Sequence, residues 1–349
     1  MAAILPQAAQ ILVAALGGLA FHLLGIPAAW MSGAMVAVVA WGAAGRGRPL
    51  PRPLADAAML VSGATMGAGI TPEALAAVSR YPLSLAVLAL SVVAGTGASA
   101  LWLTRVAGWR RDDALLASAP GALSTVLVIA SERKASVVAI AVVQSLRLFV
   151  LIALLPSLVV FLGGGRPGAL LPGEGMPVAA PAGLFVVLAG GLALGLVFER
   201  LRVAAPVLLG ATLVSASLHA TGFAPGVVPP PLAVAGLVLI GVFIGERFRT
   251  LELAALGRTL TAAAGSLVLT VAVAMAFAAA ASALAGVGFP DAMVAFAPGG
   301  LEAMMVLALI LGLDPLYVGV HHLARFLGIA TALPFAVGLL GKREARSTD

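Results

Sequence analysis

The stretch Ala117-Ser-Ala-Pro-Gly-Ala-Leu-Ser124 recurs later in the chain as Ala295-Phe-Ala-Pro-Gly-Gly-Leu-Glu302. Both stretches belong to a longer match, in which residues 113–156 align without gaps on residues 291–334, with 13 identities in 44 positions. Matches between Ala or Leu residues are weak evidence for a repeat, because they arise easily in an apolar chain. Asp, Pro-Gly, Arg and Pro matched in one register are much stronger evidence. The chain is therefore predicted to contain an internal duplication with a shift of 178 residues.

The composition is typical of a membrane protein. Hydrophobic residues make up 62% and charged residues 10% of the 349 residues, and the mean hydropathy is +1.13. Globular domains carry about 25% charged residues, so the charges here are too few to cover a soluble fold. The composition predicts a polytopic membrane protein, and it argues against a soluble enzyme, a disordered regulator or a nucleic-acid-binding protein.

Charges and Gly/Pro clusters divide the chain into twelve apolar segments. The duplication assigns six to each half, so residues 1–162 are expected to form a first membrane repeat and residues 178–341 a second. A connecting loop at 163–177 and a short basic tail at 342–349, expected in the cytoplasm, complete the organisation. The segments lie near 7–24, 28–44, 54–69, 82–103, 113–131, 135–162, 178–198, 204–221, 231–245, 260–285, 291–311 and 315–340.

The positions of Lys and Arg predict how the two repeats are oriented. If all twelve segments span the membrane, the repeats are parallel, and the loops hold 10 basic residues inside and 8 outside. If segments 113–131 and 291–311 each enter and leave on one face, the second repeat is inverted and the split is 16 to 2. Basic residues concentrate in cytoplasmic loops, which favours inversion. The expected fold is all-α, with two inverted repeats of about five transmembrane helices plus one broken or re-entrant helix each, and with both termini cytoplasmic.

The two segments that do not span in this topology each carry a Pro-Gly pair at their middle, Pro120-Gly121 and Pro298-Gly299. Proline removes a backbone donor and glycine permits turn geometry. Interrupted backbone inside a membrane is tolerated only against protein or a water-filled cavity, and paired interruptions in inverted repeats mark transporter binding sites. The alternative is that each Pro-Gly pair is a kink in an ordinary transmembrane helix.

Each break is expected to be followed by a half-helix whose free N–H groups attract an anionic group. Ser124 in the first copy could bind a ligand there, and Gly300 and Glu302 stand near the equivalent end in the second copy. Glu302 is a candidate proton or cation carrier, because it brings a titratable carboxylate into the membrane. Two other roles for Glu302 stay open: it could be an acid stabilised by the helix dipole, or an ion-pair partner for a buried arginine.

Arg147 and Arg325 occupy equivalent positions near the middle of their segments. An unpaired arginine at that depth costs about 2.5–3.5 kcal/mol on insertion scales, so each needs a partner or an aqueous cavity. Gln144 and His322 lie three residues earlier, on the same helix face. One hypothesis is anion recognition by the arginines, completed by Gln144 and His322. The alternative is structural: an arginine that holds the unwound carbonyls, or Glu302, in place.

The repeated Ala-Pro-Gly core, followed by a helix with Gln144 or His322 and Arg147 or Arg325, resembles the AbrB family of bacterial membrane proteins. The resemblance covers nearly the whole chain and implies a duplicated membrane region. Gln144 follows the family pattern, whereas His322 and Glu302 are either departures from it or variable positions. Members have been named ammonia monooxygenase and regulator of gene expression. The sequence supports neither chemistry, because copper and iron ligands and a DNA-binding segment outside the membrane are absent.

The leading functional hypothesis is a secondary transporter that moves a small anionic or zwitterionic solute by alternating access at the paired broken helices, coupled to an ion or proton gradient. Its expected partners are the solute, the coupling ion and the lipid bilayer of a bacterial inner membrane, without nucleic acid; homo-oligomerisation stays open. A membrane regulator acting through a partner is the main alternative. An intramembrane enzyme is not expected, because only Glu302 and His322 are available for catalysis. A cofactor or a metal is not expected either, because the chain has no cysteine and its histidines are scattered.

Overall fold

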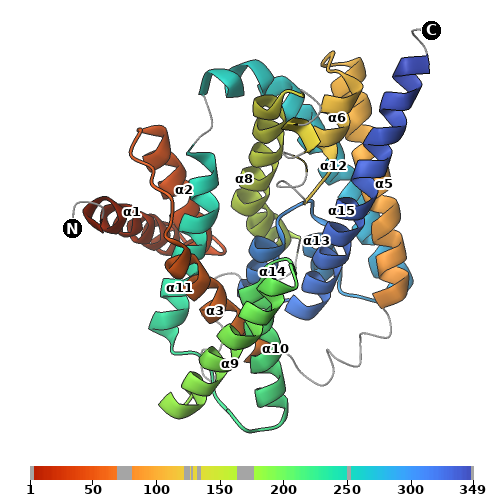
Figure 1. The fold of residues 1–349 in the computed structure, drawn as a ribbon. Helices are drawn as coiled ribbons and strands as arrows, with labels where there is room; N and C mark the ends of the chain where they lie inside the picture. Colours follow the sequence, from red (N-terminus) through yellow and green to blue (C-terminus); the bar gives the residue numbers. More distant parts are fainter. Residues whose placement is uncertain are drawn as a thin grey trace. The chain divides into compact units, whose positions relative to one another are not determined.

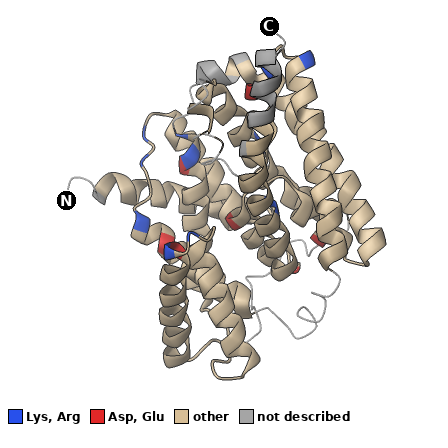
Figure 2. Ribbon diagram, turned by 45° about the vertical axis from the view of Figure 1, so that its right-hand side comes forward, with Lys and Arg blue, Asp and Glu red and all other residues tan. Residues whose placement is uncertain are grey.

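The computed structural model describes residues 4–68, 81–121, 126, 129–131, 135–162, 177–249 and 253–346. Within these ranges the regular secondary structure is helical, apart from an isolated bridge between Val178 and Val227 (Figure 1). Seven of the described helices are long and apolar enough to cross a membrane. Figure 2 shows that most of the drawn helical length is free of charged residues. Large apolar side chains such as Leu12, Leu90 and Phe185 remain exposed on these helices. The predictions of an all-α fold and of a multi-pass membrane protein are confirmed.

The helices follow the apolar segments expected from the sequence, and most boundaries agree within three residues. One difference is α12 (Leu253–Ala285), which begins seven residues before the expected segment 260–285. A second is α15 (Pro315–Arg346), which continues beyond residue 340. Charged residues such as Arg258 end an apolar segment, but arginine is a good helix former and does not end a helix.

The chain divides into two compact units, and each unit takes helices from both halves of the sequence. Unit 1 comprises Met1–Val78, Ala153–Thr250 and Glu302–Tyr317, and unit 2 comprises Ser79–Ile152, Leu251–Leu301 and Val318–Asp349. The helices α8 (Val137–Phe161) and α15 each begin in one unit and end in the other. The compact units are therefore a different partition from the two sequence repeats, whose boundaries stay a prediction.

Unit 1 is built from two helix pairs, α1 with α2 and α9 with α10, and from two contacts that join the halves, α3 with α10 and α11 with α2. Apolar clusters around Ala34 and Val242, and around Val61 and Val187, fill the spaces between these helices. The helices are α1 (Ile4–Leu23), α2 (Ala29–Ala43), α3 (Arg52–Ala68), α9 (Pro181–Arg200), α10 (Pro206–Ala220), α11 (Pro230–Gly245) with the 3-10 turn η2 (Glu246–Phe248), and α14 (Leu301–Ile310) after its first residue.

Two glycine pairs bring the helices of unit 1 together. A methyl group on Gly63 or Gly67 of α3 would overlap the backbone of α10. One on Gly241 of α11 would lie 2.5 Å from the Met31 carbonyl oxygen of α2, and one on Gly245 would lie 2.9 Å from the next turn of α2. Glycine at i and i+4 is a common device for close helix packing in membranes. The same sequence position in each half therefore packs against the other half.

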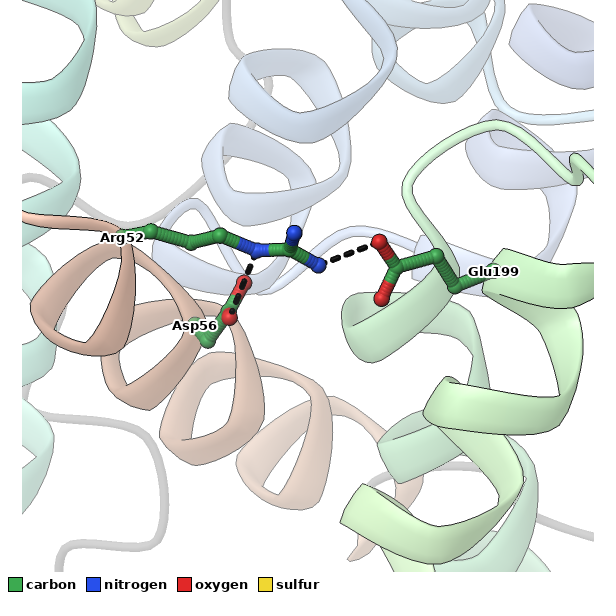
Figure 3. A network of polar contacts seen from close by, with 3 residues as sticks. All are labelled: Arg52, Asp56 and Glu199. Atoms are coloured by element: carbon green, nitrogen blue, oxygen red, sulfur yellow. Dashed lines mark hydrogen bonds and ion pairs between the residues drawn. The ribbon is translucent and has the colours of Figure 1, made fainter.

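An ion-pair network joins two helix ends of unit 1. Arg52, at the start of α3, pairs with Asp56 one turn later and with Glu199 near the end of α9 (Figure 3). Hydrogen bonding and attraction from Glu199 raise the pKa of Arg52 above its usual value. The Arg52 side chain is 67% exposed, so water screens the network and its contribution to stability is small.

Unit 2 contains both Pro-Gly pairs and both buried arginines. Its core consists of apolar residues from α5, α6, α8, α12 and α15, including Leu103, Leu116, Ile140, Ala263 and Leu333. Two short helices, α6 and α13, pack on the long helices α5 and α12, respectively. The helices are α5 (Tyr81–Arg105), α6 (Arg111–Ser118), α12, α13 (Phe289–Phe296), the larger part of α8 and nearly all of α15.

The long helices α5 and α12 are repeat equivalents and run antiparallel in unit 2. Ser99 of α5 hydrogen-bonds to Ser266 of α12 with an Oγ–Oγ distance of 2.6 Å, whereas Gly95, one turn earlier, lies next to Thr270, one turn later. Inverted repeats require equivalent helices to run in opposite directions across the membrane, whereas parallel repeats require the same direction. This pairing supports inversion, which stays a prediction.

Candidate substrate site at the helix breaks

Both Pro-Gly pairs interrupt their helices, as expected. In the first copy α6 ends at Ser118, and in the second copy α13 ends at Phe296 and α14 begins at Leu301. The residue before each proline, Ala119 or Ala297, is extended, because a following proline disfavours helical backbone. The alternative of a kink in a continuous helix is therefore wrong for the second copy, and in the first copy the chain leaves the helix before Pro120.

In the second copy Arg325 closes over the break. Its Nη1 donates to the Ala297 carbonyl at 2.6 Å and its Nη2 donates to the Gly299 carbonyl at 2.7 Å. The same Nη2 lies 2.6 Å from Nδ1 of His322, whose Nε2 lies 3.0 Å from the Val294 carbonyl. A carbonyl can only accept and a guanidinium can only donate, so these bonds require neutral His322 with its proton on Nε2.

The first copy repeats this arrangement with longer bonds. Gln144 Nε2 donates to the Leu116 carbonyl at 2.9 Å, and Arg147 donates to the carbonyls of Ser118 at 3.3 Å and Ala119 at 3.4 Å. Leu116 and Ala119 are the equivalents of Val294 and Ala297 at the shift of 178 residues. The duplication seen in the sequence is thus repeated in the hydrogen bonds, and the arginines hold the unwound carbonyls, as the structural alternative expected.

The two arginines also retain unused hydrogen-bonding capacity and charge. Arg147 is 2% exposed and Arg325 is 4% exposed, and the Nε of each is buried without a partner among the described residues. Neither forms an ion pair with a described carboxylate. The two guanidinium groups also repel one another electrostatically. Within the described part of unit 2, two positive charges are therefore buried without a counter-charge.

The two breaks and Arg325 line one small cavity. Its walls include Pro120 of the first break, Pro298 of the second break and Arg325. Gly121 has a φ of +94°, and a methyl group built there would lie 3.5 Å from Nε of Arg325. The break of the first copy thus lies against the arginine of the second. Hydroxyl-bearing residues complete the polar part of the wall: Ser91, Thr96 and Thr270.

Glu302 and Ser124 are not brought into this arrangement by the described structure. Glu302 lies in the first turn of α14 and is half-buried, with no hydrogen bond or ion pair in the described part of the chain. The first-turn position agrees with the dipole-stabilised alternative, and the carrier role stays a prediction. Gly300 immediately precedes α14. Ser124 lies outside the described residues.

Sequence reasoning missed the polar side chains of α5. Ser84 Oγ lies 2.8 Å from Nε2 of His321, Ser91 lines the small cavity, and Ser99 bonds to Ser118 and Ser266. These serines recur every seven or eight residues, so they share one helix face. A polar face on an otherwise apolar transmembrane helix was the available signal, because such residues usually face the protein interior.

The fold and site define a polytopic membrane protein in which two interrupted helix segments are held by buried arginines. The family model described as "Transition state regulatory protein AbrB" matches residues 30–341. The match covers most of the chain, which therefore belongs to the AbrB family. No curated protein and no solved structure matches the chain.

Proposed function

We propose that this protein is a secondary transporter of a small anionic or zwitterionic solute. The observation that carries the proposal is the pair of buried arginines, each bound to backbone carbonyls at a helix break and neither paired with a described carboxylate. Burial of unpaired arginine in a membrane is unfavourable, and two that repel one another make it more so. An anion bound at the breaks would offset this charge, whereas a simple cation would increase it.

Two features support transport as the activity. Paired interrupted helices in inverted repeats are the usual binding sites of secondary transporters, and the antiparallel contact of α5 with α12 supports inversion here. The breaks lie in unit 2, whereas unit 1 is packed through its glycine pairs. Coupling to protons or cations through Glu302 completes the proposal, with residence in a bacterial inner membrane and cytoplasmic termini.

The family description names a regulatory protein, which corresponds to a different mode of action. A regulator or sensor would bind a solute without moving it, and an enzyme would convert it. The chemistry of the site favours neither a regulator nor an enzyme. Its groups are guanidinium, amide, imidazole and hydroxyl side chains around the backbone carbonyls of the breaks. Net flux of an unaltered solute is therefore the property that separates the proposal from both alternatives.

The test is uptake by the full-length protein in proteoliposomes, with labelled carboxylates, inorganic phosphate and amino acids as probes, with and without a pH gradient. The proposal expects saturable uptake of at least one unmodified anion or zwitterion. Arg325→Gln should reduce this uptake at least about 30-fold, because it removes a buried charge that meets the solute. Arg52→Gln is the matched control, since Arg52 is an exposed arginine of unit 1. Binding without flux, chemical conversion of the probe, or equal uptake by both variants would overturn the proposal.

Glu302→Gln tests the coupling separately. If Glu302 carries the proton, the variant should lose the pH dependence of uptake while it still exchanges solute across the membrane. Unchanged pH dependence would show that Glu302 is not the carrier and would leave anion transport standing.

A further inference from the structure

An apolar groove of about 470 Å³ lies in unit 2, lined by α5, α6 and α15. Its walls include Leu88 and Val93 of α5, Leu115 of α6 and Leu333 of α15. This volume falls within the range of small-molecule sites in proteins. Arg325 is the one charged side chain among the described residues that line it. A ligand in the groove would thus meet an apolar wall along most of its surface and a guanidinium group at one place.

The groove and the small cavity at the breaks share part of their lining. Val92, Thr96 and Arg325 line both, so the groove and the cavity border the same three side chains. The cavity lining adds the hydroxyl-bearing residues Ser91 and Thr270, and the Nε of Arg325 has no partner among the described residues. Arg325 is therefore the charged side chain that borders both the apolar groove and the cavity at the breaks.

We propose that the transported solute is an amphiphilic monoanion, with its carboxylate or equivalent acidic group at Arg325 and its apolar tail in the groove. This inference rests on the proposed function and names its substrate class. A compact, fully polar anion would leave the apolar wall unused, and a neutral hydrocarbon would leave the charge of Arg325 uncompensated. The described lining holds no carboxylate for the ammonium group of a zwitterion. Among small anions and zwitterions, monocarboxylates with an alkyl or aromatic tail fit best.

The experiment measures binding of acetate, butyrate, hexanoate and hexanol to the full-length protein in phosphatidylcholine nanodiscs by calorimetry, with empty nanodiscs subtracted. Each methylene that enters an apolar site should tighten binding about 4-fold. Hexanoate should therefore bind more tightly than acetate by about two orders of magnitude, and hexanol should bind much more weakly than hexanoate because it lacks the charge.

Gly328→Leu fills the groove without disturbing the fold, because a side chain started at Gly328 meets no atom within 4 Å. The variant should bind acetate as the natural protein does, but its affinity should no longer increase with the chain length of the carboxylate. Gly257→Leu on α12 is the matched control, since a side chain there also meets nothing within 4 Å and Gly257 does not line the groove. Gly257→Leu should show the same increase in affinity from acetate to hexanoate as the natural protein.

Equal binding of hexanoate and acetate, or an unchanged series in Gly328→Leu, would overturn the inference. So would equal binding of hexanol and hexanoate, which would indicate a groove for a lipid acyl chain without a role for Arg325. These failures are distinct from failure of the proposed function. Uptake of small polar anions without chain-length dependence would refute the groove alone. Hexanoate binding without uptake would refute transport alone.

Discussion

The two arginine sites have the same plan but are held with different tightness. Arg325 donates to two break carbonyls at 2.6 and 2.7 Å and also contacts His322, whereas Arg147 donates at 3.3 and 3.4 Å and has no bond to Gln144. His322 reaches both a carbonyl and the arginine, because its ring carries one donor and one acceptor on opposite sides. In both copies an arginine bonds to carbonyls at the break, but the two copies differ in how tightly that arginine is held.

This difference assigns the arginines distinct places in the site. Arg325 lines both the small cavity and the apolar groove, and its short bonds fix it there. Arg147 is equally buried but only weakly bonded. A fixed guanidinium is suited to define a binding position, and a weakly held one is suited to move toward a bound anion.

The largest expected effect concerns the orientation of the two copies. Gly108 and Gly286 are equivalent turn residues after α5 and α12, and a side chain at either position meets nothing within 4 Å. Both have a positive φ, so the two substitutions carry a similar backbone strain. Because the chain has no cysteine, Gly108→Cys and Gly286→Cys can be labelled singly with a membrane-impermeant maleimide. Inverted repeats predict labelling from opposite sides of the membrane, with Gly108→Cys cytoplasmic. Labelling of both from the same side would contradict inversion.

The second prediction compares removal of the two arginines. Arg325→Gln should lower the free energy of unfolding by about 3 kcal/mol, because it strands three buried acceptors that are well bonded. Arg147→Gln should lower it by about 1 kcal/mol or less, because the two bonds that it removes are long. Chemical unfolding of the purified variants in one detergent measures both. Equal losses would contradict the distinction between a fixed and a weakly held arginine.

The third prediction concerns the glycines of the two breaks. Gly121 has a positive φ, so Gly121→Ala should destabilise the protein by about 1–2 kcal/mol. Gly299 is not among the described glycines with positive φ, so Gly299→Ala should show none of this backbone penalty. Midpoints of thermal unfolding for the two variants provide the comparison. A larger loss of stability for Gly299→Ala than for Gly121→Ala would show that the second break, and not the first, requires glycine.

The smallest expected effect comes from exchanging the residues before the arginines. His322→Gln should lose about 1 kcal/mol, because an amide must replace both the bond to Val294 and the contact with Arg325. Gln144→His should lose less or gain stability, since it can supply Arg147 with the acceptor that the second copy has. The unfolding measurement used for the arginine variants applies here. A loss for Gln144→His greater than that for His322→Gln would mean that the residue type does not set the tightness.

The sequence predicted the elements and the breaks because their causes are local. Apolar runs between charges define the helices, and Pro120 and Pro298 interrupt them through the chemistry of the proline ring. The positions of Gln144, Arg147, His322 and Arg325 on one face followed from helical periodicity. The sequence match places Gln144 and His322 at equivalent positions, and their side chains bond to the carbonyls of Leu116 and Val294, which are also equivalent in that match.

Contacts between helices far apart in the chain could not be predicted in the same way. Nothing in the local sequence specifies that Gly121 lies against Arg325, or that α3 packs on α10. The choice between anion binding and carbonyl binding for the arginines was also left open, because a guanidinium suits both acceptors. Its five N–H groups allow both at once, so the carbonyl bonds found here do not exclude a ligand.

The packing between the two halves in unit 1 has a consequence for how the chain could be divided. Since α3 rests on α10 and α11 rests on α2, a chain cut in the middle would leave both glycine faces bare. Neither fragment could complete its own packing, but two fragments made together in one cell could assemble around each other.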